Sequence, residues 1–387
     1  MAYYLSRGTL PKAQHTQLWS VDKKLRYEQH WSREGFSDIH SSMYHIYPPT
    51  EVKTVGEFVK APLKATEEKP HRHHHFTTFK FPPKGNWISG RQPNSFNNDV
   101  AMYTVCPKEN ADFFYRNGQA DEVMFVHRGS GVVETMFGRL EFHEGDYVTI
   151  PRGVMYQATF DLSEEVRLFV VESSGPVVVP TRYRNNHGQI EDWAPYSERD
   201  FRVPEWVEPK DERGEFPVLL KLQAGFQHFA LAHHPFDVVG WDGYFYPWIF
   251  NIHDYMPKVG KIHLPPPTHL TFTGPGFVLC SFCPRLFDWH EGAVPIPYAH
   301  SNVDSDEVLY YVDGDFMSRR GIEIGSITLH PQGIPHGPQP GLTEKALGAK
   351  ETNELAVMVD TFKPLNVAQA AMETDDPKYP YSWLEDA

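Results

Sequence analysis

Two histidines and a carboxylate near the C-terminal end are the residues of this chain best suited to chemistry. His300 and Glu307 share one short stretch, and His336 ends the stretch that begins at Gly325. The flanking residues predict neighbouring strands of one β-barrel, an arrangement that brings the three side chains together. Two imidazoles and one carboxylate suit non-haem iron, so the chain is predicted to be a metalloenzyme.

The elements that must position these residues are predicted to be strands. The chain contains 33 Pro and 28 Gly, which separate short runs of β-branched and aromatic residues. Such punctuation is typical of an all-β fold with many turns, and long helices are not expected. The predicted strands cover residues 100–105, 122–126, 131–137, 139–142, 147–150, 168–171, 276–280, 307–312, 326–329 and 355–359.

One spaced pattern occurs twice, once in each half of the chain. It consists of Glu-x6-Gly, then Gly-x5-Pro-x-Gly-x2 followed by Tyr or His. The first copy runs from Glu122 to Tyr156 and the second from Glu307 to His336. Two copies of one spacing indicate a duplicated domain. Only the second copy ends on a histidine.

This spacing resembles the two motifs of the cupin barrel, in which histidines and a glutamate point inward toward one metal. His300 occupies the first histidine position, Asn302 the second, Glu307 the carboxylate and His336 the last histidine. In the first copy Tyr156 replaces that last histidine. We therefore expect an all-β fold of two cupin (jelly-roll) barrels, the N-terminal one degenerate and the C-terminal one metal-binding.

Four segments are expected along the chain. Residues 1–60 are polar and irregular and predict an extended arm, and residues 61–175 predict the degenerate barrel. The Pro-rich, charged residues 176–235 predict a connecting segment. Residues 236–387 predict the catalytic barrel with an acidic tail.

Neighbouring polar residues compete for the ligand positions. Asp304 and Asp306 also follow the first histidine, but only Glu307 preserves the six-residue gap to the next glycine. In the first copy, Asn117 or Gln119 stands where the histidines are expected. The N-terminal barrel is therefore predicted to have kept its fold and lost its ligands.

Two further clusters have a metal-like or redox-like composition. The run His71–His75 is histidine-rich, but adjacent side chains cannot all face one ion. A solvated loop is favoured there, with a second metal site or a place at the rim of the active site as alternatives. Cys280 and Cys283 form a Cys-x-x-Cys pair inside an apolar run without a second pair, which favours buried structural residues.

Charge and composition limit the partners. The net charge of -14 argues against nucleic acid and against an anionic membrane surface, because both require basic protein surfaces. No apolar run is long enough to span a bilayer, and the N-terminus lacks the core of a signal peptide. The chain also has only three cysteines, which are too few for a disulfide framework. The protein is therefore expected to be soluble and cytoplasmic.

Beyond these motifs, the chain resembles the homogentisate 1,2-dioxygenase family along nearly its whole length. The second-half matches include Pro297-Tyr-Ala-His300-Ser-Asn302 and the stretch from Leu329 to Pro338. The matching segments cover residues 10–17, 34–36, 44–50, 198–204, 240–247, 283–285, 297–302 and 329–338. The resemblance implies a ring-cleaving dioxygenase that takes a small aromatic substrate and dioxygen.

The same resemblance implies roles for individual residues. It implies Fe(II) bound by His300, Glu307 and His336, with His330 beside them in contact with the substrate or the ligands. It also places His263 where a histidine accepts the phenolic proton of the substrate, although a histidine in a loop before a proline turn is an equal alternative. The family further implies a homo-oligomer built from trimers, such as a hexamer.

One departure from the family bears on the substrate. Phe316 stands where the family has a tyrosine that helps to hold the substrate carboxylate. Asn302, Tyr298 and Arg285 are the other residues predicted to bind substrate, and Arg285, Tyr298 or a residue of the N-terminal arm is expected to supply the anion anchor. Homogentisate is the expected substrate, and gentisate, hydroquinone or a similar diol is the alternative.

Two other classes of protein compete with a dioxygenase. A non-oxidative cupin such as an isomerase prefers an intact three-histidine site, and Asn302 breaks that set. A storage or sugar-binding bicupin often carries a secretory signal, which is absent here. Oxygen consumption separates the dioxygenase from both.

Overall fold

The computed structural model describes residues 3–68 and 71–384, and strands dominate this part of the chain. Within it, the one α-helix is the short α1 (Leu342–Ala346). Short 3-10 helices cover Thr78–Lys80 (η1), Thr181–Tyr183 (η2), Glu198–Asp200 (η3), Ile252–Asp254 (η4), Pro266–His269 (η5), Gln369–Thr374 (η6) and Tyr379–Tyr381 (η7). No helix in the described ranges is long and apolar enough to cross a membrane. The predicted all-β fold is confirmed.

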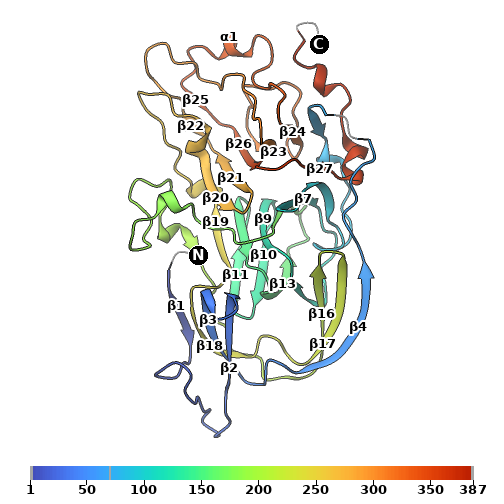
Figure 1. The fold of residues 1–387 in the computed structure, drawn as a ribbon, viewed down its shortest axis with the longest axis vertical. Coiled ribbons are helices and arrows are strands. Elements are labelled where there is room, and N and C mark those ends of the chain that lie inside the picture. Colours follow the sequence, from blue (N-terminus) through green and yellow to red (C-terminus); the bar gives the residue numbers. More distant parts are fainter. Residues whose placement is uncertain (1–2, 69–70, 385–387) are drawn as a thin grey trace.

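Three large sheets build the molecule (Figure 1). The eight-stranded sheet has the order β15 (Phe201–Arg202), β19 (Trp248–Asn251), β12 (Asp146–Ile150), β9 (Asp121–Arg128), β14 (Arg167–Ser173), β7 (Val100–Val105), β6 (Gln92–Phe96), β27 (Asn366–Val367). The seven-stranded sheet has the order β11 (Gly138–Phe142), β10 (Gly131–Thr135), β13 (Met155–Phe160), β8 (Phe114–Asn117), β16 (Arg213–Leu222), β17 (Gly225–His233), β4 (Val52–Lys60). The six-stranded sheet has the order β20 (Leu270–Gly274), β21 (Phe277–Phe282), β26 (Leu355–Thr361), β23 (Asp306–Asp313), β24 (Ile327–His330), β5 (His74–Phe76).

Two smaller sheets complete the fold. One contains β1 (Leu5–Gly8), β18 (Val238–Gly243), β3 (Ser37–His45) and β2 (Tyr27–Glu34), in that order. The other pairs β22 (Arg285–Leu286) with β25 (Glu351–Thr352). In Figure 1 the four-stranded sheet lies at the end of the molecule opposite β22 and β25.

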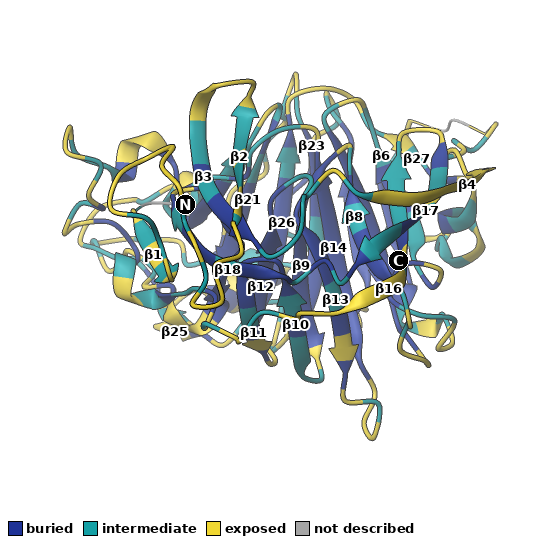
Figure 2. Ribbon diagram, turned by 90° about the horizontal axis from the view of Figure 1, so that it is seen from below, coloured by how far each residue is buried: buried dark blue, intermediate teal, exposed yellow. Residues whose placement is uncertain are grey.

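The eight-stranded sheet is buried on both faces because successive residues of a strand point to opposite sides. On β9, Val123 and Phe125 belong to one hydrophobic core, and Met124 and Val126 belong to another. The first core continues into the six-stranded sheet and the second into the seven-stranded sheet. Figure 2 shows these strands as the buried interior of the molecule.

Strand order supports the predicted duplication. The eight-stranded sheet contains the run β12-β9-β14-β7-β6, and the six-stranded sheet contains β24-β23-β26-β21-β20 in the same relative order. Glu122 on β9 and Glu307 on β23 occupy matching strands. The predicted fold class of two cupin-type barrels is confirmed, and the two halves pack back to back through these sheets.

Strands also lie in the two segments expected to be an arm and a connection. Residues 176–235, predicted as a connecting segment, contain β16 and β17, which pair with each other and with β8 and β4. Residues 1–60, predicted as an extended arm, contain β1 to β4. The sequence missed them because their side chains are mostly half-buried or exposed, which weakens the alternating pattern of a core strand. The limits of the domains stay a prediction.

Candidate metal centre

The three predicted ligands come together at one end of the six-stranded sheet. Glu307 lies near the start of β23, and the two histidines lie on loops that meet as an isolated β-bridge. His300 N donates to His336 O at 2.8 Å, and His336 N donates to His300 O at 2.9 Å. One ligand atom from each of the three side chains lies within 4.8 Å of the other two.

Backbone contacts orient both imidazoles toward the carboxylate. His300 Nδ1 lies 3.2 Å from Tyr298 O, and His336 Nδ1 lies 3.1 Å from Ile334 O. Since a carbonyl only accepts, both Nδ1 atoms carry the proton and both Nε2 atoms keep a free lone pair. The Nε2 atoms of His300 and His336 lie 3.8 and 3.6 Å from the Glu307 oxygens.

This donor set fits a divalent metal. His336 Nε2 is buried and has no hydrogen-bond partner among the residues that the structure describes, so it faces the carboxylate without a proton between them. Histidines that bind metals commonly donate their other ring N–H to a backbone carbonyl, as both do here. Two imidazole nitrogens and one carboxylate leave positions free for further ligands.

The electrostatics of the site favour a cation. Burial raises the pKa of Glu307, but the adjoining imidazoles of His300, His330 and His336 outweigh it and hold this pKa well below its usual range. Asp360 lies directly opposite Glu307 on β26, and burial together with the Glu307 charge raises its pKa to about 8. Asp360 Oδ1 is buried without a hydrogen-bond partner in residues 3–68 and 71–384. Two carboxylates thus share the site.

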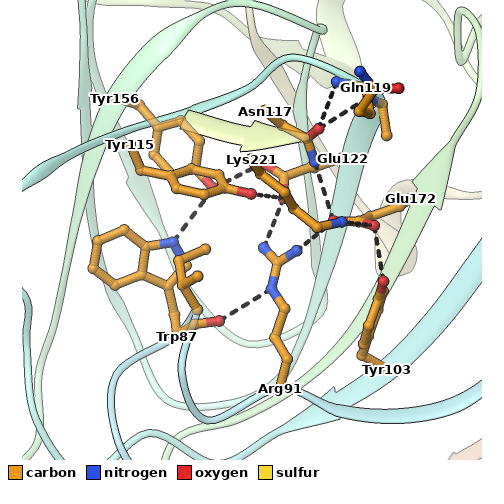
Figure 3. A network of polar contacts seen from close by, with 12 residues as sticks. Trp87, Arg91, Tyr103, Tyr115, Asn117, Gln119, Glu122, Tyr156, Glu172 and Lys221 are labelled. Carbon is orange, nitrogen blue, oxygen red and sulfur yellow. Dashed lines mark hydrogen bonds and ion pairs between the residues drawn. The ribbon is translucent and has the colours of Figure 1, made fainter. Parts of the chain in front are cut away.

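The N-terminal half contains the same pair of carboxylates with a different cation. Glu122 on β9 lies opposite Glu172 on β14, as Glu307 lies opposite Asp360. Figure 3 shows the guanidinium of Arg91 between Glu122 and Glu172, with N–O distances of 2.7 and 2.6 Å. In the described residues, no Lys or Arg forms an ion pair with Glu307 or Asp360. A buried carboxylate pair requires a counter-charge, and a bound metal supplies one.

The rest of the N-terminal cluster confirms that this half has no ligand set. Tyr156 donates to Glu122 Oε2 at 2.9 Å, in the place where the second half has His336. Asn117 Nδ2 donates to Glu172 Oε1 at 3.0 Å, and Lys221 also pairs with Glu172 (Figure 3). The site of the first copy is therefore filled by hydrogen bonds and ion pairs among its own side chains.

A cavity of about 470 Å³ opens beside the C-terminal ligands. Its wall on one side is the inner face of the six-stranded sheet, and on the other side it is formed by loops and the short β22. The second half therefore has an open pocket at the position where polar side chains fill the first half. Predicted site residues in the lining are His263, Arg285, Tyr298, His300, Asn302, Glu307 and Phe316.

Within this cavity the predicted residues differ in depth. His263 is exposed and its ring lies 5.5 Å from that of Tyr298, which is also exposed. Arg285 is paired with Glu354 at 2.8 Å, so its charge is already compensated. The ring of Phe316 packs against the ring of Tyr311, with a distance of 4.5 Å between the ring centroids.

His330 lies behind the ligands and does not line the cavity. It is fully buried, and its ring stacks on that of His336 at a centroid distance of 4.7 Å. His330 Nδ1 lies 2.8 Å from Glu307 Oε1. Of the two roles implied for His330, this position favours contact with the ligands.

The histidine run that leads into β5 and includes its first two residues differs from its prediction. His73, His74 and His75 are buried, so the expected solvated loop is wrong for these three residues. The cause is strand pairing, since β5 forms the edge of the six-stranded sheet next to β24. The ring of His73 meets that of His330 edge-on at 5.3 Å, and His71 remains exposed.

Other residues near the ligands were not found from the sequence. Asp360 and Arg319 line the cavity, and Tyr379 and Trp383 pack behind His330. None of them belongs to the cupin spacing. The only available signal was the repeat itself, which matches Asp360 to Glu172. As predicted, Cys280 and Cys283 are free and buried.

Comparison with known proteins gives a consistent family assignment. Residues 39–252 match the family model described as the N-terminal part of homogentisate 1,2-dioxygenase. A protein of Saccharolobus solfataricus named "Putative dioxygenase" is 40% identical over 99% of this chain and 99% of its own length. Homogentisate 1,2-dioxygenase of Mus musculus is 25% identical over 72% of this chain and 65% of its own length.

Human homogentisate 1,2-dioxygenase is 24% identical over 74% of this chain and 67% of its own length. The chain thus spans about two thirds of these two enzymes. Among solved structures, a glyoxylate-induced protein of Pseudomonas aeruginosa covers 80% of this chain and 97% of its own, with 11% identity and a TM-score of 0.36. A likeness this weak carries no argument about function.

Proposed function

Because the chain belongs to the homogentisate 1,2-dioxygenase family, we propose that it opens the ring of homogentisate with dioxygen to give maleylacetoacetate. Membership makes the chain a ring-cleaving dioxygenase; the substrate and the metal are the proposed parts. The proposed metal is Fe(II), held by His300, Glu307 and His336. The observation that carries the proposal is the convergence of these ligands beside a cavity of about 470 Å³.

Held by these three residues, Fe(II) would supply Lewis acidity toward a phenol and a path for electrons from the ring to dioxygen. The residues of the chain hold and orient the reactants. The carbonyls of Tyr298 and Ile334 fix both imidazoles, and the hydrogen bond from His330 fixes Glu307. Both oxygen atoms of dioxygen enter the product, so the reaction requires no external reductant.

Two groups are placed to receive the phenolic proton. Asp360 is the deeper one, because it lies beside Glu307 and its Oδ1 has no other partner. His263 is the outer one, at the rim beside Tyr298. Once a bound cation keeps Asp360 ionised, the geometry favours it as the hydrogen-bond acceptor for a hydroxyl near the ligands, with His263 passing protons at the mouth.

The acidic arm of the substrate requires a cationic partner in the cavity. Arg319 lines the cavity and forms no ion pair with any carboxylate in residues 3–68 and 71–384, whereas Arg285 is paired with Glu354. Arg319 Nε is buried and has no hydrogen-bond partner. We therefore assign Arg319, rather than Arg285, as the anchor for the carboxylate.

Oxygen consumption tests the proposed reaction. The Fe(II)-loaded protein should consume one dioxygen per homogentisate and form a product with the mass of maleylacetoacetate. Glu307→Ala should bind no iron and consume no oxygen, while Glu344→Ala on the exposed face of α1 should behave as the unaltered protein. No uptake with any dihydroxylated aromatic would contradict the proposal.

A second substrate class is supported by Phe316. A phenyl ring in the cavity offers no hydrogen bond to a carboxylate, so this position does not itself select an acid. Gentisate, hydroquinone or a similar diol is the alternative substrate. Uptake with one of these and none with homogentisate would keep the reaction type and replace the substrate.

A further inference from the structure

The C-terminal tail packs directly behind the proposed metal centre. It follows η6 and includes η7, and in Figure 1 it lies at the same end of the molecule as β24. Trp383 Nε1 donates to Gly337 O at 3.1 Å, and Gln339 Nε2 donates to Ser382 Oγ at 2.8 Å. Gly337 directly follows the ligand His336, and Gln339 lies in the same loop. The tail therefore contacts the loop that carries this ligand.

The tail also reaches the carboxylate ligand through one histidine. His330 Nδ1 lies 2.8 Å from Glu307 Oε1, and its Nε2 lies 3.0 Å from the hydroxyl of Tyr379. His330 is fully buried and Tyr379 is 4% exposed, so water does not replace either contact.

The partners of His330 decide where its proton resides. As a carboxylate ligand of the proposed site, Glu307 only accepts hydrogen bonds, so His330 Nδ1 at 2.8 Å from Oε1 must carry the proton that faces it. A neutral imidazole then has an unprotonated Nε2, which must accept from the Tyr379 O–H. The hydroxyl of Tyr379 thus selects the tautomer that donates to the carboxylate.

We propose that Tyr379 is a positioning residue for the metal centre, acting through His330 on the orientation of Glu307. The inference rests on the metal site of the proposed function. Arg319 donates to the carbonyl of Gly337, the same carbonyl that Trp383 Nε1 contacts, so it ties the tail to the ligand loop beside His330. The C-terminal tail is accordingly part of the metal site rather than an acidic appendage.

Loss of the hydroxyl should weaken metal binding more than it weakens the fold. In Tyr379→Phe, the buried Nε2 of His330 has no partner, and the ring is free to turn or to take the other tautomer. Outer partners of ligands typically change metal affinity about 10- to 100-fold, and we expect a loss in this range. Tyr381→Phe is the matched control, because Tyr381 lies in the same turn and is 64% exposed.

The experiment measures metal binding in the full-length protein without substrate. Equilibrium competition with a chelator gives the Fe(II) affinity, and the rate of transfer to the chelator gives the rate of release. The visible spectrum of the Co(II)-loaded protein reports the ligand geometry. Tyr379→Phe should release Fe(II) faster and shift the Co(II) spectrum, and Tyr381→Phe should do neither. Thermal unfolding of the metal-free proteins should be similar for both variants.

A double-mutant cycle distinguishes positioning from general weakening. In a His330→Ala background, Tyr379→Phe should cause less than about a twofold further loss of affinity, since the residue it acts through is gone. Equal, independent losses in both backgrounds would overturn the inference, as would unchanged affinity in Tyr379→Phe. If the unaltered protein bound neither Fe(II) nor Co(II), the metal site of the proposed function would itself be wrong.

Discussion

Arg319 is the residue on which substrate choice depends most. It donates to the carbonyls of Ser318 and Gly337 and lies 5.5 Å from the Trp383 ring, without a carboxylate partner in the described chain. An arginine held in place by neutral groups keeps its full charge for a ligand. Arg285, predicted as the anchor from the sequence, is neutralised by Glu354.

Arg319→Met should therefore discriminate between substrates. A hydrogen bond to a charged group contributes about 1.5–3 kcal/mol, so kcat/KM for homogentisate should fall roughly 10- to 150-fold. Hydroquinone has no carboxylate, and its kcat/KM should change much less. Arg320→Met, at the exposed neighbouring position, is the control. An equal loss for both substrates would mean that Arg319 only holds the tail.

At the scale of elements, the centre depends on two loops that approach closely. Gly337 has φ +159°, and a Cβ atom there would lie 2.5 Å from Ala299 Cα. Ala299 precedes His300 and Gly337 follows His336, so any substitution pushes the two ligand loops apart. Glycine at this position is a requirement of the β-bridge between the histidines.

Gly337→Ala should lower metal affinity while the strands remain folded. Relief of the overlap costs about 1–3 kcal/mol, which corresponds to roughly 5- to 150-fold in Fe(II) affinity if it is taken from the ligand loops. Gly348→Ala is the matched control, because Gly348 also has a positive φ and a Cβ there meets no atom within 4 Å. Metal affinity and circular dichroism of both variants give the comparison, and equal affinities would contradict the argument.

The counterpart of the metal in the N-terminal half is Arg91, and its removal should be costly. Arg91→Met leaves Glu122 and Glu172 buried with only Lys221 as a nearby cation. Breaking a buried ion pair typically costs about 3–5 kcal/mol of unfolding free energy. Arg139→Met is the control, since it breaks the exposed pair of Arg139 with Glu141 and should cost less than about 1 kcal/mol. Urea unfolding measures both, and similar losses would argue against the role of Arg91.

At the scale of the whole molecule, the two halves are joined through a dry interface that includes one histidine. His127 on β9 is buried, and the hydroxyl of Tyr310 on β23 lies 2.6 Å from its Nδ1. The ring of Phe169 stacks on Tyr310 at 4.8 Å. Burial, reinforced by Arg128 and Arg167, lowers the pKa of His127 to about 4.

This histidine should make the protein sensitive to acid. The unfolded chain binds a proton near pH 6.5, whereas folded His127 does not until about pH 4, so stability falls as the pH falls through this window. At most, this difference in pKa lowers the free energy of unfolding by about 3 kcal/mol. His127→Gln should lose less unfolding free energy between pH 7 and pH 4.5 than the unaltered protein. His187→Gln, at an exposed position, should not differ from it.

The sequence by itself determined the features that follow from local spacing. The copies that start at Glu122 and Glu307 predicted the duplication, and strand order confirms it. The spacing also selected His300, Glu307 and His336, which the fold brings together. These features were accessible because glycine turns and motif gaps are set within a few dozen residues.

Only the tertiary structure decided what surrounds those ligands. Tyr379 and His73 reach His330 from opposite ends of the chain, and Asp360 meets Glu307 only through strand pairing. Arg319 was found only in the structure, because its partners are carbonyls and rings, which no sequence motif records. Such contacts depend on how sheets pack and where loops cross, and these are long-range properties without a periodic signal in the sequence.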